Sequence, residues 1–406
     1  MRFLMVTMQY PVAPGQSYLT TELADALTAA GHEVEVLHLD WVAASGGLTR
    51  SFTTRSGVRV VRVAPRAVGG PEMLRNASKF VMSGRHAARA AWREFDLKSF
   101  DALITWMPAI AIAPLLPLVL RAGIKHRLLF IWDFFPDHHR EIGRMPGGLP
   151  FRVARVWEQR QMDRFTAIIC TLPGNELYLR EHYRVRPNQR VLVTPVWADA
   201  TPVPSIERAA IRTRYDLPPD APIAVFGGQL VEGRGFEQML AAADAAQAAG
   251  SPLHYLFVGE GRLTEMIRER AAAGGNVLYR PPVPRSDYLD LLGGCDVGMV
   301  ATVPGVTSFS IPSKTIDYLR AGLPVIAAVE HGNDFVAILD RYRVGRAVAF
   351  GDAAGFHRAA ETLATDPGLR ALARRNAPRC LDDVFDVRHA VATVLRAVQE
   401  ENQGGE

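Results

Sequence analysis

Short runs of β-branched and aliphatic residues alternate with segments of helical length along the whole chain. Most of these runs are continuously apolar, rather than apolar at every second residue, which is typical of strands buried on both faces of a parallel sheet between layers of helices. Such runs fall at 3–8, 34–39, 58–63, 102–105, 128–132, 168–171, 191–194, 223–226, 255–258, 277–279, 297–301, 325–329 and 347–350. These thirteen runs are more than one ordinary doubly wound sheet holds, so the pattern predicts two sheets.

A cluster of prolines marks the boundary between the two halves. Six prolines fall between residues 195 and 222, and after them a strand, a glycine-rich loop and a helix begin again. At roughly 100–200 residues per domain, a chain of 406 residues accommodates two such domains. We therefore expect an α/β protein with two Rossmann-like, doubly wound domains facing each other across a cleft, at 1–199 and 200–385, followed by a helix within 386–406.

Composition and charge exclude several classes of protein. Hydrophobic residues make up 48% of the chain and charged residues 22%, which is typical of a globular protein with a large core. The net charge of +4 is small for a chain that wraps nucleic acid, so we expect no nucleic-acid partner. Cys170, Cys295 and Cys380 are far apart and form no CxxC pair, which predicts neither a disulfide framework nor a zinc site and favours a reducing cytoplasm.

No segment has the pattern of a membrane span, but one suits a membrane surface. The longest apolar stretch, 106–120, contains three prolines and is shorter than the roughly 20 residues that a spanning helix needs. Residues 73–95 place apolar side chains at intervals of three and four, with basic side chains on the other faces. This pattern predicts either a half-buried helix with a solvated basic face or a helix that lies on anionic lipid at the inner face of the membrane.

Loops that follow predicted strands carry the candidate binding residues, because ligands of open parallel sheets lie beyond the carboxyl ends of the strands. The first loop, 9–17, contains Gly15 and Gln16 and precedes a helix that begins near Tyr18. Backbone N–H groups at such a helix start suit an anion or a sugar hydroxyl, although the glycine alone would serve the turn. The loop lacks the GxGxxG pattern, so it gives poor support to an NAD site.

The second loop, 226–236, carries four glycines and Arg234. A planar guanidinium beside such a loop suits a diphosphate, because it pairs with two oxygens at once. The alternative is a surface arginine beside a flexible turn.

The third loop, 304–326, gives the strongest signal. A short helix is expected to begin near Ser313 and to end before Gly322, with Lys314 and Asp317 on one face. An ammonium group there would hold phosphate oxygens, and a carboxylate one turn further would accept hydrogen bonds from two ribose hydroxyls. A plain surface ion pair between Lys314 and Asp317 is the alternative.

Taken together, these segments resemble family 4 glycosyltransferases, which are retaining enzymes with the two-domain GT-B fold. The resemblance is carried by residues 31–34, 229–235, 258–261, 317–326 and 366–370. It implies that the second domain binds a nucleoside diphosphate sugar, with a UDP-sugar as the first candidate. It also implies that the last helix returns to the first domain, that no metal or other cofactor is used, and that the acceptor is a hydroxyl of a glycan, a lipid-linked sugar or a small molecule.

The chain departs from the family pattern at two positions. Asp317 matches the second Glu of the motif Glu-x7-Glu, but Phe309 stands where the first Glu is found. Hydroxyls of the donor sugar are then expected to meet Ser308, Ser310 and the backbone as far as Ile311.

The family's pair of phosphate-binding cations falls on Gln229 and Arg234. The resemblance therefore implies that Lys314 replaces the cation missing at Gln229. The pattern from Ile311 to Lys314, with Asp317 and Tyr318, looks like the branch that transfers deoxy- or N-acetylamino sugars in surface polysaccharide assembly.

Further contacts to the donor are expected from Gly228, Gly259, Glu260 and Val283, with the base held by backbone groups around 281–284.

Asp133, at the end of a predicted strand of the first domain, resembles the aspartate of the family's aspartate-proline segment. It is expected either to orient the sugar or acceptor hydroxyl or to cap its loop. Gln16 and His138 are expected on the acceptor side, and His138 and His139 have no further residues that would complete a metal site.

The resemblance predicts glycosyl transfer in which Arg234 and Lys314 stabilise the departing diphosphate. Attack from the front face, with the leaving phosphate taking the acceptor's proton, fits retention without a dedicated base. A GT-B phosphorylase, an epimerase and a non-catalytic partner subunit remain alternatives at this point, the last because Gln229 and Phe309 depart from the family pattern.

Overall fold

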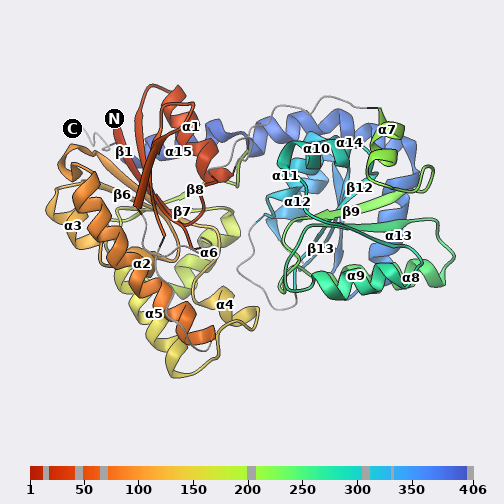
Figure 1. Cartoon of the computed structure of the whole chain (residues 1–406), viewed down its shortest axis with the longest axis horizontal. Coiled ribbons are helices and arrows are strands. Elements are labelled where there is room, and N and C mark those ends of the chain that lie inside the picture. The colour runs from red at the N-terminus through yellow and green to blue at the C-terminus, as the bar shows by residue number, and fades with distance from the viewer. Residues whose placement is uncertain are drawn as a thin grey trace. The chain divides into compact units, whose positions relative to one another are not determined.

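A computed structural model describes residues 1–11, 18–41, 49–64, 72–198, 207–303, 311–330 and 333–399 (Figure 1). These residues form two compact units. The first contains the described residues up to Pro195 and those from Val387 onward, and the second runs from Val196 to Asp386. Each unit has its own sheet and its own core, so the prediction of two Rossmann-like domains is confirmed.

The first unit contains an eight-stranded sheet in the order β3-β4-β2-β1-β5-β6-β7-β8, which is parallel except for β3. Its strands are β1 (Arg2–Thr7), β2 (Glu33–Leu39), β3 (Thr49–Thr53), β4 (Arg59–Val63), β5 (Ala102–Trp106), β6 (His126–Ile131), β7 (Ala167–Cys170) and β8 (Arg190–Val193). Its helices are α1 (Leu19–Ala29), α2 (Glu72–Glu94), η1 (Leu97–Ser99), η2 (Ala109–Ile112), α3 (Leu116–Arg121), α4 (Asp137–Glu141), α5 (Leu149–Met162), α6 (Pro173–His182) and α15 (Val387–Val398).

Helices cover both faces of this sheet. α1 and α15 lie on one face, and α2 and α6 pack on the other. Amphipathic α15, the last helix, buries Ala390, Val394 and Ala397 against the first unit, although it follows the whole second unit in sequence (Figure 1). The predicted return of the last helix to the first domain is therefore confirmed.

The edge strand β3 was not predicted, because its sequence contains only one large apolar residue, Phe52. The available signal was the turn that joins it to β4. Gly57 adopts a φ of +89° there, and the Thr54 N–H donates to the Val58 carbonyl at 2.9 Å. A tight turn with glycine is typical of a hairpin, which explains why β3 runs antiparallel to β4.

The second unit contains a six-stranded parallel sheet in the order β11-β10-β9-β12-β13-β14. Its strands are β9 (Ile223–Gly227), β10 (His254–Val258), β11 (Val277–Arg280), β12 (Val297–Ala301), β13 (Val325–Val329) and β14 (Gly345–Ala349). Its helices are α7 (Arg208–Arg214), α8 (Phe236–Ala248), α9 (Thr264–Ala272), α10 (Arg285–Leu292), α11 (Lys314–Arg320), α12 (Asp334–Tyr342), α13 (Ala353–Thr365), α14 (Pro367–Cys380) and a π-helical turn, η3 (Leu381–Phe385).

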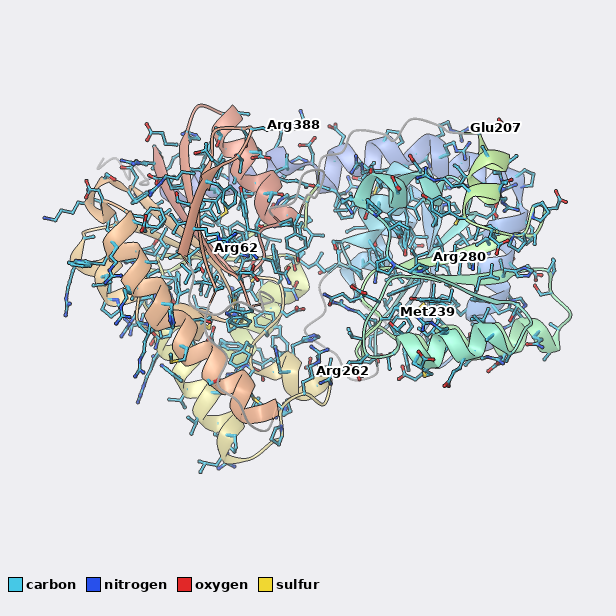
Figure 2. The ribbon with its side chains drawn as sticks, in the orientation of Figure 1. Arg62, Glu207, Met239, Arg262, Arg280 and Arg388 are labelled. Atoms are coloured by element: carbon cyan, nitrogen blue, oxygen red, sulfur yellow. The ribbon has the colours of Figure 1, made fainter. Side chains whose placement is uncertain are left out.

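The strand order of the second unit reverses next to β9. The chain adds β10 and β11 on one side of β9 and then crosses to add β12, β13 and β14 on the other. α8 and α13 cover one face of the sheet, and α11 packs on the other face with α14 behind it. Met239 of α8, labelled in Figure 2, is fully buried beneath the first of these layers. The switch point between β9 and β12 is where an open α/β sheet binds its ligand.

The proline-rich segment expected to be the boundary also contains a helix. α7 lies within it and belongs to the second unit, where Arg208 and Arg212 bind the buried carboxylate of Asp296. The prolines therefore frame a short helix as well as a connection.

Candidate functional site

Two glycine-containing loops of the second unit pack backbone to backbone at the carboxyl ends of β9 and β10. The Gly228 N–H donates to the Val258 carbonyl at 3.0 Å, and the Leu230 N–H donates to the Glu260 carbonyl at 2.9 Å. Gly259 has a φ of +143°, and a Cβ at this position would overlap with the Gly228 carbonyl oxygen. Only glycine allows this approach, so the loops are held in one arrangement.

The loop after β9 also reaches β12. Gly235, directly before α8, has a φ of +66° and lies against Ala301 and Thr302 at the end of β12. This contact carries the exposed Arg234 to the switch point of the sheet.

Lys314, the first residue of α11, lies at the same edge. Its Nζ is 3.8 Å from the centroid of the Phe226 ring at the end of β9, a cation–π contact. A Cβ at Gly228 would lie 3.9 Å from the Lys314 Cε, so the lysine stem runs beside the first loop. Burial and, secondly, the positive charge of Arg234 hold the pKa of Lys314 well below its usual value. An anion bound between these two cations would relieve their repulsion and stabilise the ammonium form.

Asp317 lies one turn further along α11, and its carboxylate is buried. Arg285 of α10 donates from Nη1 to Oδ2 at 2.9 Å and from Nη2 to Oδ1 at 2.7 Å, a bidentate ion pair. No ion pair joins Asp317 to Lys314, although the structure describes both side chains. The alternative of a plain surface Lys–Asp pair is therefore wrong.

A buried tyrosine, Tyr318, fixes α11 against the sheet. The Tyr318 hydroxyl donates to the Met299 carbonyl at 3.2 Å and accepts from the Gly227 N–H at 3.3 Å. A Cβ at Gly298 would overlap with the Tyr318 ring, so the helix approaches β12 closely. These contacts set the positions of Lys314 and Asp317 relative to the glycine loops.

The remaining predicted donor residues are placed as follows. Gln229 and Glu260 are exposed on the two glycine loops, and Val283 is half-buried in the loop after β11. Ile311 is fully buried, so only its backbone is available to a ligand. Gly15, Gln16, Ser308, Phe309 and Ser310 lie outside the described residues.

Sequence reasoning missed two residues of this site. Arg285 had no signal, because nothing in the spacing of α10 and α11 indicates that their side chains meet. Phe226 was noted only as the end of a strand, and its role under Lys314 depends on the way α11 packs.

In the first unit, Asp133 and His138, both expected on the acceptor side, lie near each other. Asp133 follows β6 with a 56% exposed side chain, and its Oδ1 is 4.0 Å from the His138 Nε2. The neighbouring His139 is half-buried, and its burial, with the charge of His138 as the next cause, lowers its pKa to about 4. Within the residues that the structure describes, no three His, Cys, Asp or Glu side chains gather in an arrangement that would hold a metal ion.

Aromatic rings support the Asp133 loop. The ring of Trp132 lies 5.4 Å from that of Trp106 and 5.8 Å, edge to face, from that of Tyr18. Such contacts favour a rigid loop, so Asp133 extends from a well-packed base.

Two Rossmann-like units, the second with cations at its switch point, define the class of GT-B proteins. Residues 15–197 match the glycosyl transferase 4-like domain, and residues 221–366 match the family of glycosyl transferases group 1. The chain therefore belongs to the family 4-like glycosyltransferases, and it is a sugar-transferring enzyme of the GT-B type. The resemblance seen in the sequence is confirmed, and a phosphorylase or an epimerase is disfavoured.

Similar proteins support this assignment. The chain is 22% identical to WcaI of Escherichia coli K12, named as a colanic acid biosynthesis glycosyl transferase, over 81% of this chain and 84% of that protein. Two solved structures share the fold. The sucrose-phosphate synthase of Thermosynechococcus elongatus superimposes with a TM-score of 0.69 at 17% identity, covering 98% of each chain. WaaG, a glycosyltransferase involved in lipopolysaccharide biosynthesis, superimposes with a TM-score of 0.67 at 14% identity over the whole of both chains.

Proposed function

We propose that this enzyme transfers a sugar, with retention of configuration and without a metal ion, from a nucleoside diphosphate sugar to a hydroxyl acceptor in surface polysaccharide assembly. The observation that carries the proposal is the pair of Lys314 and Arg234 at the switch point of the second sheet, close enough for one charge to lower the other's pKa. Two cations that repel each other in the free protein are suited to a doubly charged leaving group.

The proposed chemistry follows from where charge develops. The bond between the anomeric carbon and the diphosphate oxygen breaks, and its electron pair stays on that oxygen. Lys314 and Arg234 stabilise the resulting anion, which is the largest kind of contribution that such a site makes. The acceptor oxygen then bonds to the anomeric carbon on the same face, and the leaving phosphate takes the acceptor's proton.

Asp317 is proposed to bind the ribose of the donor. Each of its carboxylate oxygens accepts one bond from Arg285 and has a further lone pair available. The ion pair thus orients the carboxylate and still leaves one lone pair on each oxygen to accept a hydrogen bond from a ligand. In the first unit, Asp133 with His138 is proposed to orient the acceptor hydroxyl or the transferred sugar.

The test is a screen of UDP-, GDP-, dTDP- and ADP-sugars by thermal shift, followed by a transfer assay with the donor that binds. We expect Lys314→Ala and Arg234→Ala to abolish transfer. Arg358→Ala, at an exposed position on α13, should leave transfer unchanged. Activity should persist in EDTA, and NMR of the product should show the donor's anomeric configuration. Full activity in both active-site variants would contradict the phosphate assignment, and donor binding without turnover would favour a non-catalytic subunit.

We also propose that the first unit docks on anionic membrane. No helix in the described part of the chain combines the length and hydropathy needed to cross a bilayer. α2 exposes Arg85, Arg89 and Arg93 beside Trp92, which is 72% exposed. The basic face of α2 is thus solvated, as both readings of the sequence expected.

α5 adds an apolar stripe that the sequence analysis did not single out. Leu149, Val153 and Val156 are spaced by four and three residues on this helix, and all are more than half exposed. Arg152 and Arg160 are exposed on the same helix, whose only acid, Glu158, is buried. Both α2 and α5 pack against η2. Apolar side chains among arginines, without acids, suit the interface of anionic lipid.

Flotation with phosphatidylcholine vesicles, with and without phosphatidylglycerol, tests this docking. The wild type should float only with the anionic vesicles, and both Val153→Glu and the triple change of Arg85, Arg89 and Arg93 to Glu should remain at the bottom. Leu177→Glu, at an exposed apolar position on α6, serves as the control and should float. Unchanged flotation of the first two variants would contradict docking through α2 and α5.

A further inference from the structure

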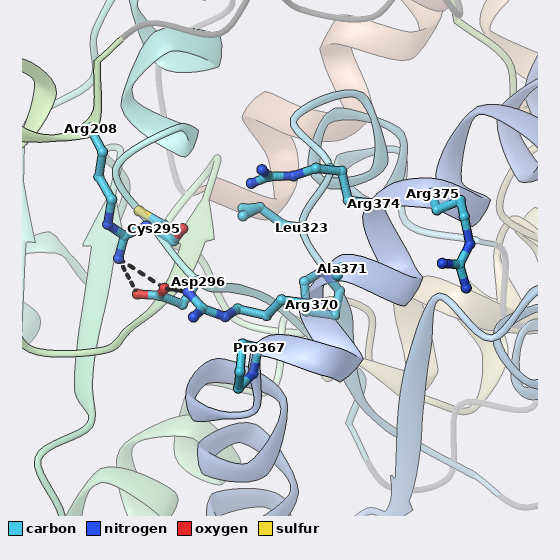
Figure 3. Close-up of a pocket in the computed structure, with 11 residues that line it drawn as sticks. Arg208, Cys295, Asp296, Leu323, Pro367, Arg370, Ala371, Arg374 and Arg375 are labelled. Carbon is cyan, nitrogen blue, oxygen red and sulfur yellow. Dashed lines mark hydrogen bonds and ion pairs between the residues drawn. The ribbon is translucent and has the colours of Figure 1, made fainter.

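A second basic pocket lies at the other edge of the sheet in the second unit (Figure 3). Asp296 and Pro324 line it, and they precede β12 and β13, whereas Lys314 and Gly228 mark the carboxyl edge. The cavity has a volume of about 510 Å³, within the range of small-molecule sites. It is therefore separate from the candidate donor site of the same unit.

Positive charge in this pocket exceeds negative charge. Four arginines and a single carboxylate, that of Asp296, line the cavity. The carboxylate is buried and accepts from the Arg208 Nη2 at 2.8 Å and from the Arg370 Nη1 at 2.7 Å. Arg212, just beyond the cavity, donates to it at 3.2 Å. The single negative charge of Asp296 is thus already shared among three guanidinium groups.

Arg374 is a further cation without a counter-charge. It follows Arg370 by one turn of α14, and among the described residues its guanidinium has no hydrogen-bond or ion-pair partner. Figure 3 shows it extended over Leu323 on the side of Arg208 and Arg370, whereas the guanidinium of Arg375 points away. Like charges four residues apart destabilise a helix, so this arrangement favours a bound anion.

The side chain of Arg374 is held in place by packing. A Cβ at Gly322 would lie 3.0 Å from its Cγ and 3.1 Å from its Nε, so the stem runs across the loop that follows α11. Gly322 itself has a φ of +71°, and the Leu323 N–H donates to the Tyr318 carbonyl at 2.9 Å. A cation fixed in this way is preorganised for a ligand. In addition, the Nε of Arg370 is buried and lacks a hydrogen-bond partner.

We propose that this pocket binds the phosphate group of a small phosphorylated molecule. Guanidinium groups match phosphate oxygens in geometry and charge, and Arg374, with the surplus charge of Arg208 and Arg370, provides them from two helices. Leu323, Pro367 and Ala371 form an apolar wall beside the cations, on which the body of a phosphate ester packs. A bare phosphate ion would leave this wall unused.

Hydrogen exchange of the full chain locates the binding directly. Glucose 6-phosphate and inorganic phosphate are the probes. In the wild type, glucose 6-phosphate should slow exchange in residues 321–324 and 367–375, at concentrations lower than inorganic phosphate needs. Arg374→Gln should weaken this protection about tenfold or more, since a charge-assisted hydrogen bond is lost. Arg374→Lys keeps the positive charge but loses the planar guanidinium. Its affinity for glucose 6-phosphate should therefore lie between those of the wild type and Arg374→Gln.

Arg375→Gln is the matched control and should behave as the wild type. Lys314→Ala should also keep the protection, because the donor site lies at the opposite edge of the sheet. Wild-type protein that shows no protection at these two segments would overturn the proposal, as would full protection in a folded Arg374→Gln variant. Equal affinity for phosphate and its ester would overturn the assignment to a phosphorylated molecule.

Discussion

Arg285 of α10 donates hydrogen bonds to both carboxylate oxygens of Asp317 of α11, at 2.9 Å and 2.7 Å. The carboxylate is buried while the arginine is partly exposed. Charge-assisted bidentate pairs fix the direction of the carboxylate plane. The ion pair therefore places the free lone pairs of Asp317 in a constant orientation, which a ligand that contacts two adjacent hydroxyls requires.

If Asp317 binds the ribose, the enzyme will distinguish UDP from 2′-deoxy-UDP. We expect the wild type to bind UDP about tenfold or more tightly, because the deoxy ligand leaves a carboxylate oxygen unpaired. Asp317→Asn should remove most of this preference. Arg285→Gln should weaken binding of both ligands while keeping part of the preference, because the carboxylate remains.

Isothermal titration of the two ligands measures these affinities. Asp340→Asn, an exposed acid on α12, is the control and should match the wild type. An unchanged preference in Asp317→Asn would place the ribose elsewhere.

Lys314 should lower the stability of the free enzyme. Its pKa is held down by burial and by Arg234, so the folded state disfavours the ammonium form that the unfolded chain carries near neutral pH. Lys314→Met keeps the stem over Phe226 without the charge, and we expect it to raise stability by about 1 kcal/mol while abolishing nucleotide binding. Thermal unfolding with and without UDP measures both effects.

The sign of the pH dependence follows from the same lysine. Stability should rise with pH between the lowered pKa of Lys314 and its usual value, because only the unfolded chain gains a proton as the pH falls through that window. Lys314→Met should lack this component, and Lys314→Arg should retain nucleotide binding. A destabilised Lys314→Met protein would contradict the argument.

The site residues that could be predicted are those whose relative positions depend on local sequence alone. Lys314 and Asp317 were found because a short helix with defined ends fixes which residues share a face. The Arg285–Asp317 pair, 32 residues apart, was not found because it depends on how two helices pack. The fold was predicted more fully, since continuous apolar runs report burial directly. Among the strands in the described residues, only the polar edge strand β3 was not predicted.

Gly259 should tolerate no side chain, because its Cβ would overlap with the Gly228 carbonyl and separate the two loops. We expect Gly259→Ala to cost about 3 kcal/mol and to abolish nucleotide binding, since strain at a positive φ adds to the clash. Gly274→Ala is the matched control. Gly274 also has a positive φ, +82°, but no atom within 4 Å of a Cβ, so it should cost about 1 kcal/mol and leave binding unchanged.

Chemical denaturation and UDP titration separate the two glycine variants. Equal losses in both would show that backbone strain, rather than the contact between the loops, limits the substitution. Normal UDP binding by a folded Gly259→Ala protein would mean that the loops do not form the nucleotide site.

In the first unit, the buried carboxylate of Glu158 should make stability fall as the pH rises. It accepts from the N–H groups of Ala109 at 2.6 Å and Ile110 at 2.9 Å, yet burial outweighs these bonds and raises its pKa from 4.5 to about 7. The folded state therefore holds a proton that the unfolded chain has lost between these values. The contribution of protonated Glu158 to the free energy of unfolding is fully present below about pH 4.5, and it is lost as the pH rises through about 7.

Glu158→Gln keeps the shape without the titration, so its Tm should fall less than that of the wild type between pH about 5.5 and about 8.5. The difference in stability should be on the order of 2 to 3 kcal/mol, because each unit of pKa shift corresponds to about 1.4 kcal/mol. Glu181→Gln removes an exposed carboxylate of the same unit and should follow the wild type. Parallel pH profiles for wild type and Glu158→Gln would mean that Glu158 stays ionised throughout, with the two N–H groups outweighing its burial.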